Sequence, residues 1–243
     1  MRINELKTLL FSDTTDVINL IALFDKKPED IIYYFKSKNI VITKNWKEYY
    51  DYLLSRNIFS IAGITKTEIL NIVYHLILSS QESDLSYDKF KNSIQELITS
   101  TGFIPNQDKK ILESPARLKL IFRQNNQTSF MAGRYKQMIE NANIRPYWRY
   151  VGVEDNNSRL NHLEVQNFFK NKVVKYNNPF WLSWYPPNGF NCRCGVESYT
   201  LDEVNKRNLI ITSAVPYFRQ DEGFNTTPDK LITLVDPVPL FNK

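Results

Sequence analysis

The sequence predicts an α+β fold, with a helical N-terminal half followed by a small mixed α/β module that contains a long aromatic loop. In the first hundred residues, apolar side chains recur at helical spacing. After Arg145-Pro146 the residues become β-branched and aromatic, which is typical of strands. Residues 177–194 combine aromatic side chains with turn-forming ones. We therefore expect a helical region over residues 1–105 and an α+β module over residues 106–243.

The expected helices of the first half rest on apolar stripes and start signals. One helix is expected from Asp16, and one begins at Pro28, where proline suits the first turn. Another is expected from Trp46 to Leu54. Residues 65–68, Thr-Lys-Thr-Glu, have the pattern of a capping box before an apolar stripe. That stripe consists of Ile69, Ile72, Val73, Leu76 and Ile77.

The remaining elements follow in order. Ser86 is expected to cap a helix that ends before Gly102 and Pro105, and residues 106–110 form a polar linker. Ser114-Pro115 predicts the start of a long helix that runs to about Ala142. The pattern then predicts a strand over 147–153 that is covered on both faces, a turn at 156–158 and a short helix over 159–169. A strand at 173–174, a loop over 177–194, and a strand end and helix over 197–204 are expected to follow.

Composition excludes several classes of protein. Hydrophobic residues make up 42% and charged residues 23% of the 243 residues, which excludes a wholly disordered chain. No apolar run reaches the roughly 18 residues that span a bilayer, and the N-terminus has no apolar segment of a signal peptide. The only two cysteines, Cys192 and Cys194, exclude a disulfide framework, so we expect a cytosolic protein or one assembled there. A net charge of +5 is compatible with nucleic-acid contact without requiring it.

The second half concentrates the groups that could carry chemistry. Thiolate and imidazole are good zinc ligands, so His162, Cys192 and Cys194 could bind zinc if the fold brings them together. The fourth ligand would be Asp155, Glu164 or a water, and a bound water would leave the site open for catalysis. Cys-x-Cys is a weaker zinc signature than Cys-x-x-Cys. The competing interpretation is two buried thiols and a histidine hydrogen-bonded to a carboxylate.

Other interpretations of the same residues stay open. His162-Leu163-Glu164 invites comparison with zinc nucleobase deaminases, but Pro187 is too far from Cys192 and the cysteine spacing is one residue short. Asp155 and Arg159 lie four residues apart, and with His162 they could form a structural network that locks the strand to the following helix. Five arginines could meet phosphates, although a solvated face explains them better: Arg117, Arg123, Arg134, Arg145 and Arg149.

Several segments together resemble one family. They are residues 145–151 (Arg-Pro-Tyr-Trp-Arg-Tyr-Val), then Asp155, Arg159 and His162, then residues 179–181 (Pro-Phe-Trp), and residues 185–194 (Tyr-Pro-Pro-Asn-Gly-Phe-Asn-Cys-Arg-Cys). This pattern resembles the phage Mu F-like family of minor head, or head-morphogenesis, proteins. Further landmarks in the same order include residues 28–35, residues 128–135 and residues 223–225, so the resemblance covers about residues 28–230.

The resemblance implies a phage or prophage minor capsid protein. Such a protein is made in the bacterial host cytoplasm, becomes part of the virion, and associates with the portal vertex to assist head assembly, DNA packaging or DNA delivery. Its expected partners are the portal and other capsid proteins, with packaged DNA as a further candidate, and no membrane. We expect no enzymatic activity and no certain cofactor, although a structural zinc could fasten the loop-rich segment. The alternative is a zinc-dependent hydrolase or deaminase that acts on nucleic acid.

Overall fold

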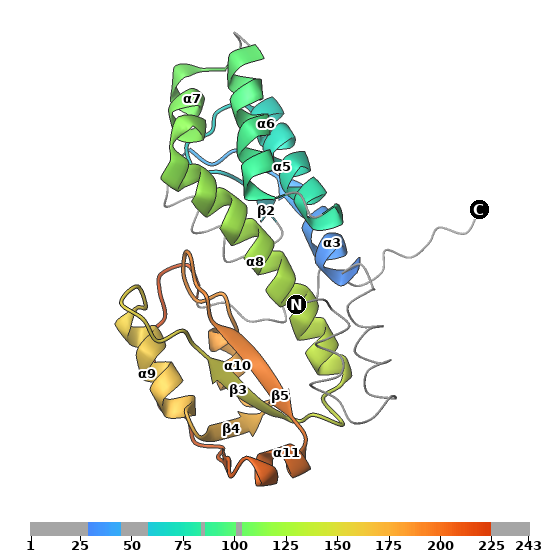
Figure 1. The fold of residues 1–243 in the computed structure, drawn as a ribbon, viewed down its shortest axis with the longest axis vertical. Coiled ribbons are helices and arrows are strands. Elements are labelled where there is room, and N and C mark those ends of the chain that lie inside the picture. The colour runs from blue at the N-terminus through green and yellow to red at the C-terminus, as the bar shows by residue number, and fades with distance from the viewer. Residues whose placement is uncertain (1–28, 45–57, 84–85, 101–103, 225–243) are drawn as a thin grey trace, which may run out of the picture.

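The computed structural model describes residues 29–44, 58–83, 86–100 and 104–224. The α+β fold class is confirmed: a group of helices lies at one end of the molecule and a small sheet with shorter helices lies at the other (Figure 1). The helices expected from Asp16 and from Trp46 lie outside the described residues. The division of the chain at residues 105 and 106 stays a prediction.

The first part of the chain forms a helical body with its own apolar core. Its elements are α3 (Glu29–Lys36), β1 (Asn39–Ile40), β2 (Ile58–Phe59), α5 (Thr67–Glu82), α6 (Tyr87–Ser100) and α7 (Asn106–Glu113). The two short strands pair in parallel. Val73, Ile77 and Ile94 are fully buried in this core. As expected, Ser86 caps α6, since its Oγ accepts a hydrogen bond from the Lys89 amide at 3.4 Å.

Two predictions for this region were wrong. The segment 106–110 is the beginning of helix α7 and not a linker. Thr65 does not cap α5 in a capping box, because the helix has Lys66 at its N-cap position and no side-chain cap. The buried carboxylate of Asp108 in α7 instead accepts hydrogen bonds from the Thr65 and Lys66 amides. A distant carboxylate thus satisfies the backbone at the start of α5.

Helix α8 (Pro115–Glu140) connects the helical body to the α+β module, along which it continues in Figure 1. Its start is confirmed: Ser114 accepts a hydrogen bond from the Arg117 amide, and Pro115 occupies the first turn. The half of α8 near the module packs against α3. A Cβ on Gly133 would lie 2.7 Å from Ile31 Cγ1 and 3.1 Å from the Ile31 amide nitrogen, so only glycine allows this close approach. Lys136 and Asp30 form an ion pair at 2.7 Å between the same helices.

The module is built on a mixed four-stranded sheet with the strand order β5-β3-β4-β6. Its elements are β3 (Tyr147–Val151), α9 (Leu160–Phe169), β4 (Lys172–Lys175), α10 (Phe180–Trp184), β5 (Gly195–Tyr199), α11 (Leu201–Lys206) and β6 (Ile210–Ile211). Strand β3 is antiparallel to both neighbours, and β4 is parallel to β6. Apart from α10, the order of strands and helices predicted from residues 147–204 agrees with this arrangement.

Two further predictions are corrected in the module. Strand β3 is fully buried on one face only, where Trp148 and Tyr150 lie, while Arg149 on the other face is half-buried and pairs with Glu197. The expected loop over residues 177–194 contains the short helix α10. The aromatic side chains of α10 lie in the module core: Trp184, for example, stacks parallel to Phe180 with ring centroids 6.2 Å apart. Within the described ranges, no helix is long and apolar enough to cross a membrane.

Candidate metal centre

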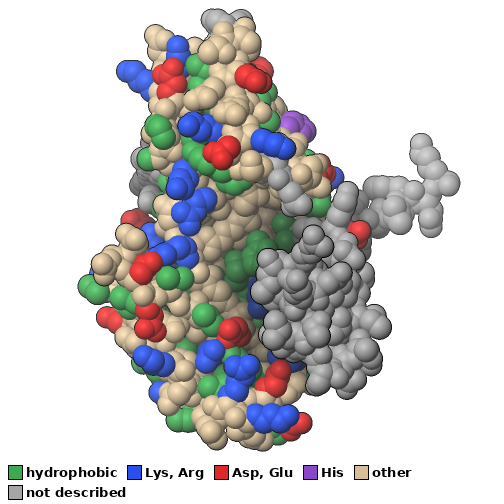
Figure 2. Space-filling model, viewed as in Figure 1, with side chains coloured by type: hydrophobic (Ala, Val, Ile, Leu, Met, Phe, Trp, Pro, Cys, Tyr) green, Lys and Arg blue, Asp and Glu red, His purple; other side chains and the backbone are tan. Residues whose placement is uncertain are grey.

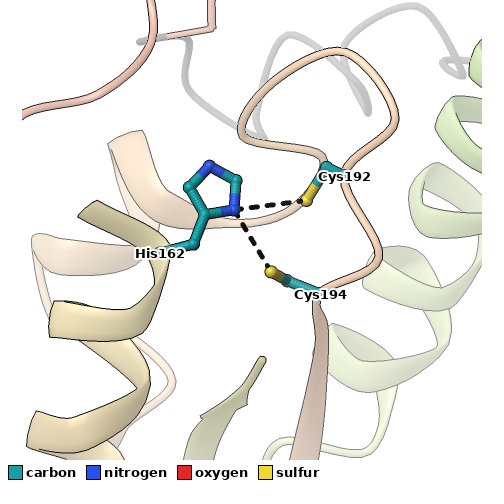
Figure 3. Close-up of side chains that lie close together, drawn as sticks. All are labelled: His162, Cys192 and Cys194. Atoms are coloured by element: carbon teal, nitrogen blue, oxygen red, sulfur yellow. Dashed lines mark hydrogen bonds between the residues drawn. The ribbon is translucent and has the colours of Figure 1, made fainter. Parts of the chain in front are cut away.

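His162, Cys192 and Cys194 meet in the interior of the module. His162 lies in the first turn of α9, and the two cysteines lie in the loop that leads into β5 (Figure 3). The His162 Nδ1 atom is 3.3 Å from Cys194 Sγ and 3.9 Å from Cys192 Sγ. Their three candidate ligand atoms all lie within 4.8 Å of one another, and all three residues are buried. The structure thus brings together the three residues that the sequence offered as zinc ligands.

The local fold of the loop directs the two thiols inward. Cys192 ends a turn in which its amide donates to the Gly189 carbonyl at 3.2 Å. Asn191 within that turn has a φ of 56°, a left-handed conformation that asparagine tolerates better than most residues. One residue separates the cysteines, and this residue, Arg193, is exposed. Both sulfurs face His162 (Figure 3).

The other ring nitrogen of His162 is held by the backbone. Nε2 lies 3.2 Å from the carbonyl oxygen of Asn188, which can only accept, so Nε2 is the protonated nitrogen in this contact. The Asn188 side chain is itself held, since its Nδ2 donates to the Trp184 carbonyl at 3.0 Å. Nδ1 therefore presents a lone pair to the two sulfurs.

The two thiols share their protons unequally. A hydrogen bond from Cys192 to Cys194 lowers the pKa of Cys194, an effect that burial opposes. The same hydrogen bond, together with burial, raises the pKa of the Cys192 thiol. Cys194 is therefore the thiol that ionises first.

Two further polar atoms are buried next to the cluster. The Tyr150 hydroxyl faces Cys194 and Asn188, and neither it nor Asn188 Oδ1 makes a hydrogen bond of ordinary geometry within the part of the chain that the structure describes. Burial raises the pKa of the Tyr150 hydroxyl well above its ordinary value, and the adjacent Cys194 and Cys192 raise it further. Neither residue was predicted as part of the site from the sequence. Tyr150 has the pattern of an ordinary core strand residue, and Asn188 has the pattern of a turn residue.

Asp155 lies apart from this cluster. Its two carboxylate oxygens accept hydrogen bonds from Arg193 Nη1 and Nη2, both at 2.6 Å, on the exposed side of the loop. Hydrogen bonding from Arg193 holds the pKa of Asp155 far below its usual range. These two hydrogen bonds occupy both carboxylate oxygens of Asp155. The donors that converge as a possible metal site are His162, Cys192 and Cys194, without Asp155.

The expected network of Asp155, Arg159 and His162 has different contacts. Arg159 pairs with Asp221 at 3.0 Å and donates to the Phe190 carbonyl at 2.5 Å, so it fixes the loop from outside. Glu164 is exposed on α9, away from the buried His162. In a zinc deaminase the glutamate lies at the metal, and the position of Glu164 does not match that arrangement.

Four of the five arginines considered for phosphate contact bind protein groups instead. Arg117 donates to the Ala62 carbonyl, Arg134 to the Val196 carbonyl, and Arg145 to the Ser198 carbonyl. Arg149 pairs with Glu197. Arg123 is exposed on α8.

Comparisons with known proteins point to one family. Residues 86–197 match the family described as Phage Mu protein F like protein, a range that includes all three residues of the buried cluster. The "Putative capsid assembly protein F" of Escherichia phage Mu is 29% identical over 204 residues, which are 80% of this chain and 45% of that protein. The "Mu-like prophage FluMu F protein" of Haemophilus influenzae is 32% identical over 187 residues, which are 75% of this chain and 44% of that protein. The chain thus spans less than half the length of these curated relatives. No solved structure matches it significantly.

Proposed function

Through residues 86–197 the chain belongs to the family of Phage Mu protein F like proteins, and on that basis we propose that it is a minor protein of a phage or prophage head that acts at the portal vertex. There it assists head assembly, DNA packaging or DNA delivery. The observation that carries the proposal is the similarity, over 80% of this chain, to a phage Mu protein whose name describes capsid assembly. The chain is made in the host cytoplasm and becomes part of the virion.

The structure supports a role as a rigid building block. Helix α8 packs against α3 through Gly133 and Ile31 on one side. On the other side, Arg134 donates to the carbonyl of Val196 in β5. The helical body and the module therefore share one helix, and a force on either part is transmitted to the other. Within this proposal the cluster of His162, Cys192 and Cys194 is structural, because it fastens α9 to the loop before β5.

The proposed partners are the portal protein, other capsid proteins and packaged DNA. Figure 2 shows basic side chains interspersed with acidic ones, and several basic side chains between the helical body and the module. A surface with both signs of charge is better suited to contacts with charged protein partners than to binding DNA along a continuous basic face. A DNA contact by this surface should weaken steeply as salt rises, because phosphate binding releases counterions.

Two experiments test the proposal. The first coexpresses the chain with the portal protein of the same phage or prophage and follows both by size-exclusion chromatography. We expect the two proteins to elute together. For comparison, the chain is coexpressed with the major capsid protein and analysed under the same conditions. Separate elution at all salt concentrations would contradict a direct portal contact.

The second experiment uses the assembling particle. Deletion of the gene from an inducible prophage is expected to reduce the number of DNA-filled heads, and the wild-type chain supplied from a plasmid is expected to restore them. Mass spectrometry of purified heads should find the chain in few copies. Normal yields of infectious particles without the gene would contradict the proposed role.

The proposal includes the absence of catalysis. The rival function is zinc-dependent hydrolysis or deamination of nucleic acid, in which Glu164 would act as the general acid and base. The exposed position of Glu164 argues against that role. Turnover of single-stranded DNA or RNA by the purified chain, lost in Glu164→Gln and kept in the matched exposed variant Glu154→Gln, would support the rival function.

A further inference from the structure

We propose that His162 Nδ1 and the Sγ atoms of Cys192 and Cys194 bind one Zn²⁺ ion, with an oxygen from Asn188 or from a water as the fourth donor. This site goes beyond the proposed role in the phage head. It rests on four observations: the spacing of the donors, the orientation of the imidazole, the buried oxygens beside them, and access from the surface.

The spacing of the donor atoms suits a tetrahedral zinc ion. With Zn–N of about 2.0 Å and Zn–S of about 2.3 Å, a tetrahedral site places nitrogen and sulfur about 3.5 Å apart. The distances from His162 Nδ1 to Cys194 Sγ and to Cys192 Sγ are 3.3 and 3.9 Å, on either side of that value. The three donor atoms therefore already lie near the separations that a shared zinc ion requires.

The imidazole is oriented as a metal ligand requires. A ligating histidine usually donates its other ring N–H to a carbonyl or carboxylate, which fixes the tautomer and leaves a lone pair for the metal. His162 Nε2 makes this contact with the Asn188 carbonyl at 3.2 Å. The ring also lies edge-to-face with Trp184, with centroids 5.8 Å apart, which restricts its rotation.

The oxygens next to the cluster supply the fourth donor. Asn188 is fully buried and Tyr150 is 1% exposed. The Tyr150 hydroxyl lies within reach of Cys194 and of Asn188, but neither it nor Asn188 Oδ1 makes a hydrogen bond of ordinary geometry among the described residues. Buried polar atoms of this kind are normally satisfied by protein, water or an ion. Asn188 Oδ1 could bind the metal directly or hold a metal-bound water, to which the Tyr150 hydroxyl could also bond.

Charge and access also suit a divalent ion. Two thiolates neutralise Zn²⁺, so the occupied site adds no net charge to the core, and a Cys₂His set favours zinc over oxygen-preferring Mg²⁺ or Ca²⁺. A pocket with about 20 Å³ of room for water reaches His162, Cys192 and Cys194 from the surface. The three donor side chains therefore line a small pocket and are not sealed inside a closed core.

The test measures the metal content of the full chain, purified without a polyhistidine tag. We expect about one zinc per chain by mass spectrometry of the metal. Replacement of zinc by Co²⁺ should give the intense thiolate-to-cobalt absorption of a tetrahedral site with two sulfurs. Wild-type chain that is folded by circular dichroism, holds less than about a tenth of an equivalent of zinc and gives no such absorption would overturn the proposal.

Variants separate the site from general folding. His162→Gln should reduce the zinc content at least tenfold, whereas His162→Cys should keep it, because cysteine is also a zinc ligand. His75→Gln is the matched control, since His75 lies on α5 outside the cluster and should leave the zinc content unchanged. If His162→Gln does not fold, the zinc content of Cys194→Ser and the cobalt spectrum of the wild type show whether the ion binds at this cluster. Zinc retained in both His162→Gln and Cys194→Ser would place the ion elsewhere and contradict the site.

Discussion

The guanidinium of Arg134, in α8, donates hydrogen bonds from Nε at 3.2 Å and Nη2 at 2.8 Å to the backbone carbonyl of Val196, in β5. β5 is the edge strand of the sheet on that side, so its outward carbonyls lack a neighbouring strand. Arg145 donates in the same way to the carbonyl of Ser198, two residues further along β5, at 2.6 Å. The two arginines thus cover the sheet edge and attach it to the long helix and its C-terminal turn.

Arg134→Ala is expected to lower the free energy of unfolding by about 1.5 to 3 kcal/mol, the range for hydrogen bonds that involve a charged group. The loss should be smaller in Arg134→Lys, which keeps one charged donor. Urea unfolding followed by circular dichroism measures both. Arg123→Ala is the control, because Arg123 is exposed on the same helix, and its effect should stay within about 0.5 kcal/mol. Equal losses in Arg134→Ala and Arg123→Ala would show that the Val196 contact contributes nothing.

Gly133→Ala is expected to destabilise the chain although alanine favours helices. The new Cβ would lie 2.7 Å from Ile31 Cγ1 and 3.1 Å from the Ile31 amide nitrogen, so α3 has to move away from α8. We expect a net loss of about 2 kcal/mol, because a contact this close to backbone lies near the upper end of the about 1 to 3 kcal/mol that overpacking costs, and the gain in helix propensity returns up to about 1. Thermal unfolding measures the change.

Gly195→Ala is the matched control for this substitution. A Cβ on Gly195 would meet no atom within 4 Å, so the melting temperature should change little. A stable Gly133→Ala chain would mean that α3 is not held against α8 as the structure describes.

Asp108→Asn is expected to weaken the junction between α7 and α5. The carboxylate of Asp108 is fully buried and accepts from the amides of Thr65 and Lys66 and from the Thr65 hydroxyl, at 2.8–3.2 Å. An amide group replaces one acceptor oxygen by a donor, which would face backbone N–H groups. We expect a loss of about 2 to 3 kcal/mol in urea unfolding. Asp88→Asn, in the exposed first turn of α6, should lose less than about 1 kcal/mol; a similar loss in both would contradict the role of Asp108.

The same contact shows where local sequence patterns fail. Residues 65–68 have the pattern of a capping box, but the acceptor for the Thr65 amide is 43 positions away in sequence. No pattern within one turn of helix can indicate a partner at that distance. Strands β1, β2 and β6 have two residues each, too few to show alternation. Long elements with start signals, such as α8, were predicted close to their observed bounds.

The candidate site was predictable in its chemistry but not in its geometry. His162, Cys192 and Cys194 are recognisable as donors because histidine and cysteine are rare in this chain, with two of each. Asp155 is equally suitable by chemical type. Its bond to Arg193 depends on how the loop before β5 folds back, which no spacing rule gives. Asn188 was missed because it has the pattern of a turn residue, and its carbonyl contact with His162 appears only in the folded loop.

Acid is expected to destabilise the chain partly through Glu197 in β5. Burial raises the pKa of this carboxyl, but hydrogen bonds from the Tyr199 hydroxyl and from Arg149 lower it more, so it lies below the ordinary value of 4.5. A carboxyl with a lower pKa in the folded chain than in the unfolded chain adds stability above the unfolded pKa. That stability is lost as the pH falls through the folded pKa.

Glu197→Gln should therefore melt at a lower temperature than the wild type at pH 7, and the difference should shrink as the pH falls below about 4.5 and protonates Glu197 in the wild type. Melting curves between pH 3 and pH 7 measure this convergence. Glu96→Gln, on the exposed face of α6, should follow the wild type at every pH. If the gap for Glu197→Gln stayed constant down to pH 3, the loss would come from the shape of the amide, and the charge on Glu197 would not hold β5 to Arg149 in β3.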